Sequence, residues 1–416
     1  MNVSKHTKQM MQFYSENNHI NISKQTSRTD NIIKGFYSDI YEAHKYVEGI
    51  KKSKNYYTLS TRRIKNGEIP IPKHFDANSF PEIVRTHIQQ FSKTELTFSF
   101  SLYEREITVI FILEDEHHKV NHETYRNYID AIIMWLYIVN NYASKQCVNK
   151  MTNYFYFSSL EKNLPDANIS TLSDIHVNTA FTRTCPKDSE IIIFRKEEWF
   201  KVFIHETFHN FALDFSDMYT GTVHKHILDI FKVRSDVNLY ESYTEFWAEI
   251  INALFCSFIS LKEKTNIDEF LSNSEFFINF ERTHSFFQLV KTLGFMGLTY
   301  NDLYSETEHS KKNRENLYKE NTNVLAYYII KTILINNYQD FLFWCKKNNS
   351  TILQFKKTAK NQDELCNFIK NNYKTKSMLN GIKESQLFLN RILSAEKSGE
   401  FKFVLNSLRM SICELG

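Results

Sequence analysis

The feature that most constrains the fold is a helix-forming stretch, EWFKVFIHETFHNFALDF, at residues 198–215. Apolar side chains cover nearly its whole circumference, which is typical of a helix buried on most sides rather than of a surface helix. The same stretch contains His205, Glu206 and His209. Burying ionisable groups is costly unless they find partners, so these three side chains need compensation.

The spacing H-E-x-x-H offers that compensation as a metal site. In a helix the rings of His205 and His209 lie one turn apart on one face, about 6 Å along the axis, so both can reach one ion. Glu206 is rotated by about 100° from His205, so it can take a proton from water without ligating the ion. The alternative is a pair of core histidines satisfied by backbone carbonyls. A third ligand directly downstream is excluded, because Ala212 and Phe215 occupy the required positions of H-E-x-x-H-x-x-G-x-x-H.

A second helical stretch, ESYTEFWAEIINALFCSF at residues 241–258, can supply the third protein ligand that a catalytic metal site needs. Its apolar residues form a wide surface interrupted by a narrow stripe of small and polar residues at helical spacing. Glu245 and Glu249 lie one turn apart on that stripe. Glu241, one further turn back, competes with Glu245 for the role of third ligand.

The two motifs together, H-E-T-F-H followed by E-F-W-A-E, resemble the gluzincin class of zinc metallopeptidases, in which E-x-x-x-D follows H-E-x-x-H on the next major helix. The resemblance covers about residues 190–260. It implies that His205, His209 and Glu245 bind a zinc ion and that Glu206 acts as the general base.

The resemblance also implies a role for Glu249 and an architecture for the chain. Glu249 would take the place of the family's Asp, the carboxylate that orients a ligand histidine, on an arm longer by one methylene. We therefore expect a two-lobed, zincin-like α+β fold with a polar tail over residues 1–35. An upper lobe at 36–215 would hold a small mixed sheet and the first helix, and a helical lower lobe at 216–416 would deliver the third ligand.

Several short segments before the first helix have the composition of strands. Residues 96–103 and 107–114 indicate a β-hairpin, and residues 153–159 indicate a further strand. The segments 175–182 and 190–195 are two more candidates. One of these two is predicted to be an edge strand above the zinc, where an extended peptide adds by backbone pairing; an ordinary edge strand is the alternative.

Composition narrows the choice of partners and compartment. A net charge of +3 spread over 416 residues excludes the concentrated basic surface typical of proteins that bind nucleic acid or anionic membranes. The six scattered cysteines predict reduced thiols in an intracellular protein. With a polar N-terminus and no long apolar run, we expect a cytoplasmic protein. Abundant Asn, Lys, Ile, Phe and Tyr suit an AT-rich genome, such as that of a parasite or large virus.

The resulting functional prediction is zinc-dependent hydrolysis of a peptide or protein substrate, with Glu206 passing a proton from water to the leaving amine. Two alternatives remain open: a non-catalytic binding or structural protein that keeps the metal site, and a hydrolase of another amide or ester. Peptidases of this kind also need a donor for the developing oxyanion. His284, Tyr327 and Tyr328 lie on helices that could face the site, and none of them is assigned this role.

Overall fold

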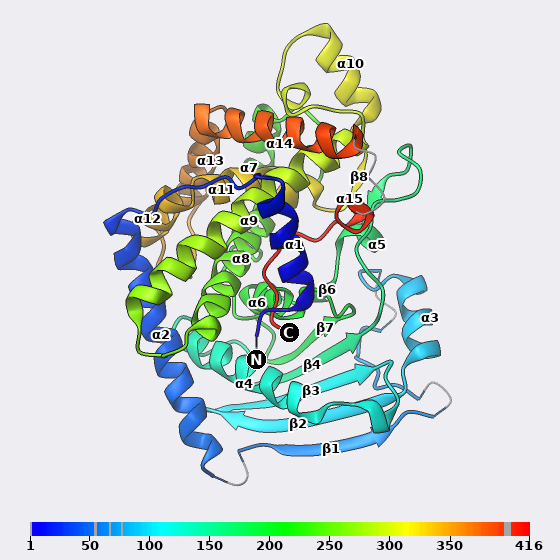
Figure 1. Ribbon diagram of the computed structural model, residues 1–416, viewed down its shortest axis with the longest axis vertical. Helices are drawn as coiled ribbons and strands as arrows, with labels where there is room; N and C mark the ends of the chain where they lie inside the picture. The colour runs from blue at the N-terminus through cyan, green and yellow to red at the C-terminus, as the bar shows by residue number, and fades with distance from the viewer. Residues whose placement is uncertain (1, 54–55, 66–67, 76–77, 395–400) are drawn as a thin grey trace.

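The main sheet lies at one end of the molecule, and most of the helices lie above it in the view of Figure 1. The computed structural model describes every residue except 1, 54–55, 66–67, 76–77 and 395–400. The main sheet is mixed and has six strands in the order β1-β2-β3-β4-β7-β6. This arrangement confirms the predicted α+β class.

The sheet combines an antiparallel half with a parallel half. Pairing is antiparallel from β1 through β2 to β3 and parallel from β3 through β4 to β7. The edge strand β6 pairs antiparallel with β7. The hairpin of β2 and β3 confirms the predicted one, and β4 and β7 confirm two other predicted strands. The strand bounds are β1 Thr58–Arg63, β2 Thr94–Leu102, β3 Arg105–Leu113, β4 Lys150–Phe157, β6 Ala180–Thr182 and β7 Asp188–Ile193.

Apolar residues at every second position of the strands give the sheet a buried face. Along β2, every second side chain from Leu96 to Leu102 is buried, and the Thr and Ser residues between them are partly exposed. The helix α4 (His122–Asn140) connects β3 to the parallel strand β4, because parallel neighbours need a long crossover. α4 packs against β2 and against the long helix α2 (Ser27–Lys51).

Two helices, α6 (Trp199–Asn210) and α8 (Leu239–Ser260), connect the parallel half of the sheet to the helical part of the molecule. α6 follows β7 directly and contacts β6, β7 and α8. Every residue of α6 except His209 is buried, as its all-round apolar pattern predicts. α8 in turn packs against α9 (Ile267–Phe295), so both helices with the sequence motifs are interior elements.

The remaining helices surround α6 and α8, and α9 contacts α2, α11 and α14 as well as α8.

Within the described residues, no helix combines the length and apolar character needed to cross a membrane. The other bounds are α3 Glu82–Phe91, α5 Asp174–Val177, α7 Gly221–Ile230, α10 Glu308–Leu317, the π-helix η3 Leu325–Ile330, α11 Lys331–Asn336, α12 Tyr338–Asn348, α13 Ala359–Asn372, α14 Lys376–Ser394 and α15 Lys402–Asn406, with the short strands β5 Leu172–Ser173 and β8 Glu320–Asn321 and 3₁₀ turns η1 His117–Lys119 and η2 Tyr300–Leu303.

The N-terminal residues differ from the predicted polar tail. Residues 5–16 form the helix α1, and α2 already begins at Ser27. Met10, Phe13 and Tyr14 lie at helical spacing on one face of α1 and are buried against α9 and α14. This narrow apolar stripe, set in a polar sequence, is enough to dock the helix.

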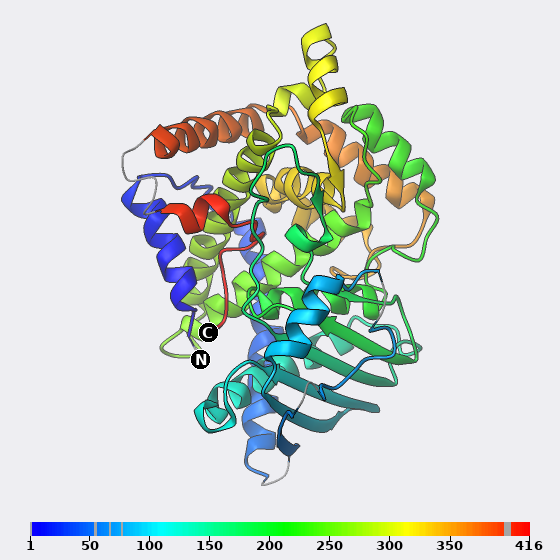
Figure 2. The same ribbon diagram turned by 90° about the vertical axis from the view of Figure 1, so that its right-hand side faces the viewer.

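The C-terminal residues run through the interior in an extended segment. The two ends of the chain meet in an antiparallel bridge between Val3 and Leu415, and they lie side by side in both views (Figures 1 and 2). Side chains hold the backbone of residues 407–413 along its length. Their donors and acceptors come from Glu198, Asn252, Glu281, His284, Gln288, Lys291, Tyr328 and Lys331.

A disulfide corrects the prediction that all cysteines are reduced. Cys147 and Cys185 are joined, whereas Cys256, Cys345, Cys366 and Cys413 are free and buried. The bond ties the loop before β4 to the turn between β6 and β7. No local pattern predicts this pairing, because the two residues lie 38 positions apart with no motif between them.

Removing this bond is expected to destabilise the fold. Closing a 38-residue loop stabilises a folded protein by about 3–4 kcal/mol in the chain-entropy estimate, so Cys147→Ala combined with Cys185→Ala should lower the unfolding free energy by that order. Urea unfolding measures this, with the buried free cysteine variant Cys366→Ala as control. Thiol titration in urea without reductant should find four thiols per chain, and six thiols would contradict the assignment.

Candidate metal centre

Contacts with the sheet and with α4 fix the rotation of α6. The Trp135 indole N–H on α4 donates to the Thr207 hydroxyl at 2.7 Å. At the end of α6, the amide of Asn210 accepts from the Ser189 hydroxyl at 2.6 Å and donates to the Thr182 hydroxyl at 2.8 Å. These bonds tie the helix to β7 and β6, so the face with His205 is turned toward α8.

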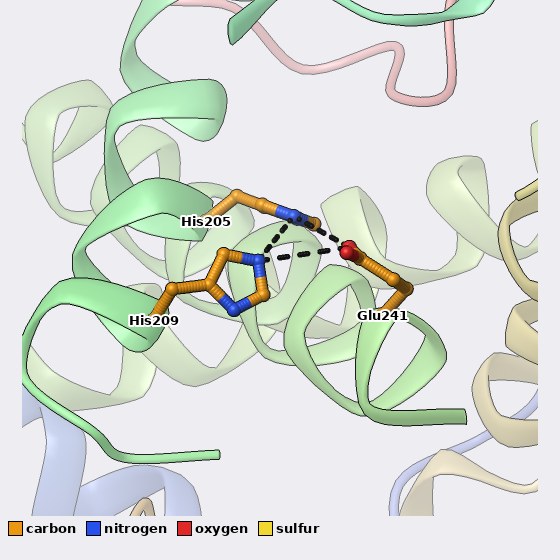
Figure 3. A group of neighbouring side chains, drawn as sticks. All are labelled: His205, His209 and Glu241. Atoms are coloured by element: carbon orange, nitrogen blue, oxygen red, sulfur yellow. Dashed lines mark hydrogen bonds and ion pairs between the residues drawn. The ribbon is translucent and has the colours of Figure 1, made fainter. Parts of the chain in front are cut away.

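Two imidazoles and one carboxylate meet between α6 and α8 (Figure 3). His205 Nε2 lies 3.2 Å from His209 Nε2 and 3.1 Å from an Oε of Glu241. His209 Nε2 lies 3.6 Å from the same carboxylate oxygen. His205 is buried, and the other two side chains are partly exposed toward a cavity.

These distances fit a tetrahedral zinc ion. Zinc binds imidazole nitrogen and carboxylate oxygen at about 2.0–2.2 Å, which separates neighbouring ligand atoms by about 3.3 Å. The three observed separations scatter around this value. The donor set of two nitrogens and one oxygen leaves a fourth position on the cavity side. His205, His209 and Glu241 could therefore hold a metal ion.

Carboxylates on the far side of each ring set the tautomers. His205 Nδ1 lies 2.8 Å from Glu245 Oε2, and His209 Nδ1 is hydrogen-bonded to Asp214. A carboxylate accepts the proton on Nδ1, so the lone pair of each Nε2 is left for a metal. This paired arrangement is the usual support of histidine ligands to zinc.

The positions that the sequence assigned to Glu245 and Glu249 are each occupied by the glutamate one helical turn earlier in the chain. Glu245 is not part of the cluster formed by His205, His209 and Glu241. One of its carboxylate oxygens is hydrogen-bonded to His205 Nδ1, and the other accepts a hydrogen bond from the Lys201 ammonium group at 2.7 Å. Glu249 pairs with Lys331 at 2.6 Å instead of orienting a histidine. The competitor Glu241, rather than Glu245, lies where a third ligand could reach the ion, and Glu245 lies where it could orient His205.

The charges around the imidazoles favour a cation. Burial works against protonation, yet hydrogen bonds from Glu241 and Glu245 raise the pKa of His205 to about 9. The pKa of His209 is raised above its ordinary value despite its burial, chiefly by the charge of Asp214. Carboxylates that hold protons on imidazoles in this way also stabilise a divalent ion in their place.

The cavity beside the cluster has a volume of about 180 Å³ and includes Glu206 in its wall. The edge strand β6 also lines the cavity, but it covers only residues 180–182 of the predicted strand 175–182, because residues 174–177 form the helix α5. Thr179 accepts a hydrogen bond from Phe194 N at 2.9 Å. By the alternation of an antiparallel pair, Ala180 and Thr182 then direct their N–H and C=O groups toward the open edge.

Sequence reasoning missed Asp214 and left Tyr327 unassigned. Tyr327, on η3, lines the cavity and donates its hydroxyl to Glu241 at 2.8 Å. The contact between Tyr327 and Glu241 depends on how η3 packs against α8, and no local sequence pattern predicts that packing. Asp214 lies five positions after His209, and this acidic residue in an apolar stretch was the available signal. His284 and Tyr328 bind the C-terminal segment instead.

Comparisons with protein-family models, with curated proteins and with solved structures found no match to this chain. The functional argument therefore rests on the geometry of the metal centre and its cavity.

Proposed function

We propose that this protein is a zinc-dependent peptidase with Glu206 as its general base. The observation that carries the proposal is the placement of Glu206 in the wall of the cavity onto which His205, His209 and Glu241 open. A carboxylate there can act on water beside the metal, whereas a purely structural zinc site is closed by four protein ligands.

Each residue then has a defined task. When bound, a zinc ion supplies Lewis acidity to the substrate carbonyl and to the attacking water. Glu206 accepts the water proton and passes it to the leaving amine, and burial raises its pKa toward the range useful for this transfer. Tyr327 lines the same cavity, and its hydroxyl could stabilise negative charge on the substrate oxygen once its proton is turned from Glu241 to the substrate.

The edge of β6 supports an extended peptide as substrate. The backbone groups of Ala180 and Thr182 can pair with a peptide that lies antiparallel or parallel to β6 along the cavity. Backbone pairing recognises any extended chain, and it would hold one peptide bond near the metal. An amide or ester of another kind would not use these groups.

The test is cleavage of a mixed peptide library by the purified protein after metal analysis. We expect about one zinc per chain, and we expect cleavage that a chelator stops and added zinc restores. Zinc without cleavage would favour a non-catalytic binding protein instead. A zinc-replete preparation with no bound metal would refute the site itself.

A further inference from the structure

Two buried lysines lie at one end of the cavity, beyond His205. Lys201 precedes His205 by one turn of α6, and Lys162 comes from the segment after β4; their exposed fractions are 3% and 1%. Both line the cavity, and Val177 and Met410 line it beside them. Ammonium groups in the wall of a buried cavity are costly unless they serve a ligand or a partner.

Their protein partners leave hydrogen-bonding capacity unused. An ammonium group carries three N–H donors. Within the part of the chain that the structure describes, the Lys162 ammonium has Glu198 as its one partner. The Lys201 ammonium donates to Glu245 at 2.7 Å and lies 3.8 Å from Glu198.

The carboxylate of Glu198 is shared among several groups, so it does not serve Lys162 alone. One of its oxygens accepts the backbone N–H groups of Met410 and Ser411 at 3.1 and 2.7 Å. Burial lowers the pKa of Lys162 even with Glu198 beside it. The Lys162 ammonium is therefore incompletely compensated and would gain from another anion.

We propose that this end of the cavity binds a carboxylate of the peptide substrate through the ammonium groups of Lys162 and Lys201. The inference rests on the proposed peptidase function and adds a substrate class to it. Lys201 and the metal ligand His205 are one turn apart on α6, so their backbones lie about 6 Å apart along the axis, and both side chains line one cavity. Because an extended peptide rises about 3.3 Å per residue, a carboxylate held by these lysines would belong to a residue near the scissile bond.

Two sources of the carboxylate fit this distance. One is the side chain of an Asp or Glu next to the scissile bond, which would make the enzyme selective for acidic sequences. The other is the α-carboxylate at the C-terminus of the substrate, which would make it remove short C-terminal pieces. Paired peptides separate the two sources: Glu against Gln next to the scissile bond, and a free C-terminus against an amidated one.

The experiment compares these peptide pairs on the wild type, Lys162→Met and Lys162→Arg. We expect the wild type to prefer the carboxylate member of one pair by at least about 10-fold in kcat/KM. Lys162→Met should lose the preference and keep its zinc, and Lys162→Arg should retain it. The matched control is Lys291→Met, which removes another buried lysine (4% exposed) that donates to the backbone of Val404 and Ser407 and does not line the cavity, so it should leave the preference unchanged.

Binding separates this inference from the proposed function. The same pairs are titrated onto the Glu206→Gln variant, whose proposed base is removed while both lysines remain. Tighter binding of the carboxylate member, lost on adding Lys162→Met, supports the site even if no peptide is cleaved. Cleavage and binding that ignore the carboxylate in both pairs overturn the inference and leave the peptidase proposal intact.

Discussion

Replacing Glu206 with glutamine should abolish peptide cleavage and leave one zinc ion bound. The amide has nearly the volume of the carboxylate, but it cannot accept the proton of the attacking water. Loss of a general base typically costs about 10²–10⁴-fold in rate, so kcat should fall at least into that range. Turnover of the best library peptide and metal content of the same sample measure the two expectations.

Glu249→Gln is the matched control for this variant. Glu249 is also buried, but it pairs with Lys331 and does not line the cavity. Its replacement should lower thermal stability and preserve cleavage. If Glu206→Gln still cleaved peptides at a rate near that of the wild type, Glu206 would not be the base, whatever its effect on metal content.

Replacing Glu241 with alanine should remove zinc binding, whereas Glu245→Gln should only weaken it. Glu241 would supply one of three protein ligands, and its loss would leave two imidazoles. Glu245 acts through Nδ1 of His205, and removal of such an orienting carboxylate typically costs about 10- to 100-fold in metal affinity. Competition with a chromogenic chelator gives both affinities on one scale.

The order of these two losses decides which glutamate is the ligand. Asp214→Asn is a useful companion, because it alters the partner of His209 in the way that Glu245→Gln alters the partner of His205. The two should weaken zinc binding to a similar extent. A larger loss for Glu245→Gln than for Glu241→Ala would restore the ligand assignment expected from the sequence.

The sequence was sufficient to predict which side chains of α6 share one face, but it did not determine which glutamate of α8 lies beside them. Helix geometry alone brings His205 and His209 to one face, and an all-round apolar pattern predicted the burial that the structure has. On α8, however, glutamates recur every four residues at 241, 245 and 249, so all three share one face. Which one meets the imidazoles depends on how far α8 is displaced along α6, and that offset is a property of tertiary packing.

Two other features that the sequence did not predict also depend on tertiary packing. The three apolar residues that dock α1 are too few to distinguish it from a solvated segment until α9 is there to receive them. The pairing of Cys147 with Cys185 depends on the parallel register of β4 and β7, which brings their preceding turns together. Strands with a clear period of two, such as β2 and β3, needed no such long-range information.

The extended C-terminal segment has a consequence for how the protein is made. Glu198, at the start of α6, finds its backbone partners at Met410 and Ser411, roughly 200 residues later in the chain. At about 5–20 residues per second, a ribosome needs on the order of 10–40 s to synthesise that interval. Throughout it, a carboxylate destined for the interior lacks two of its donors, and the cavity lacks part of its wall. The cavity beside the metal centre is therefore completed only when Met410 has been synthesised, after every other residue of its lining.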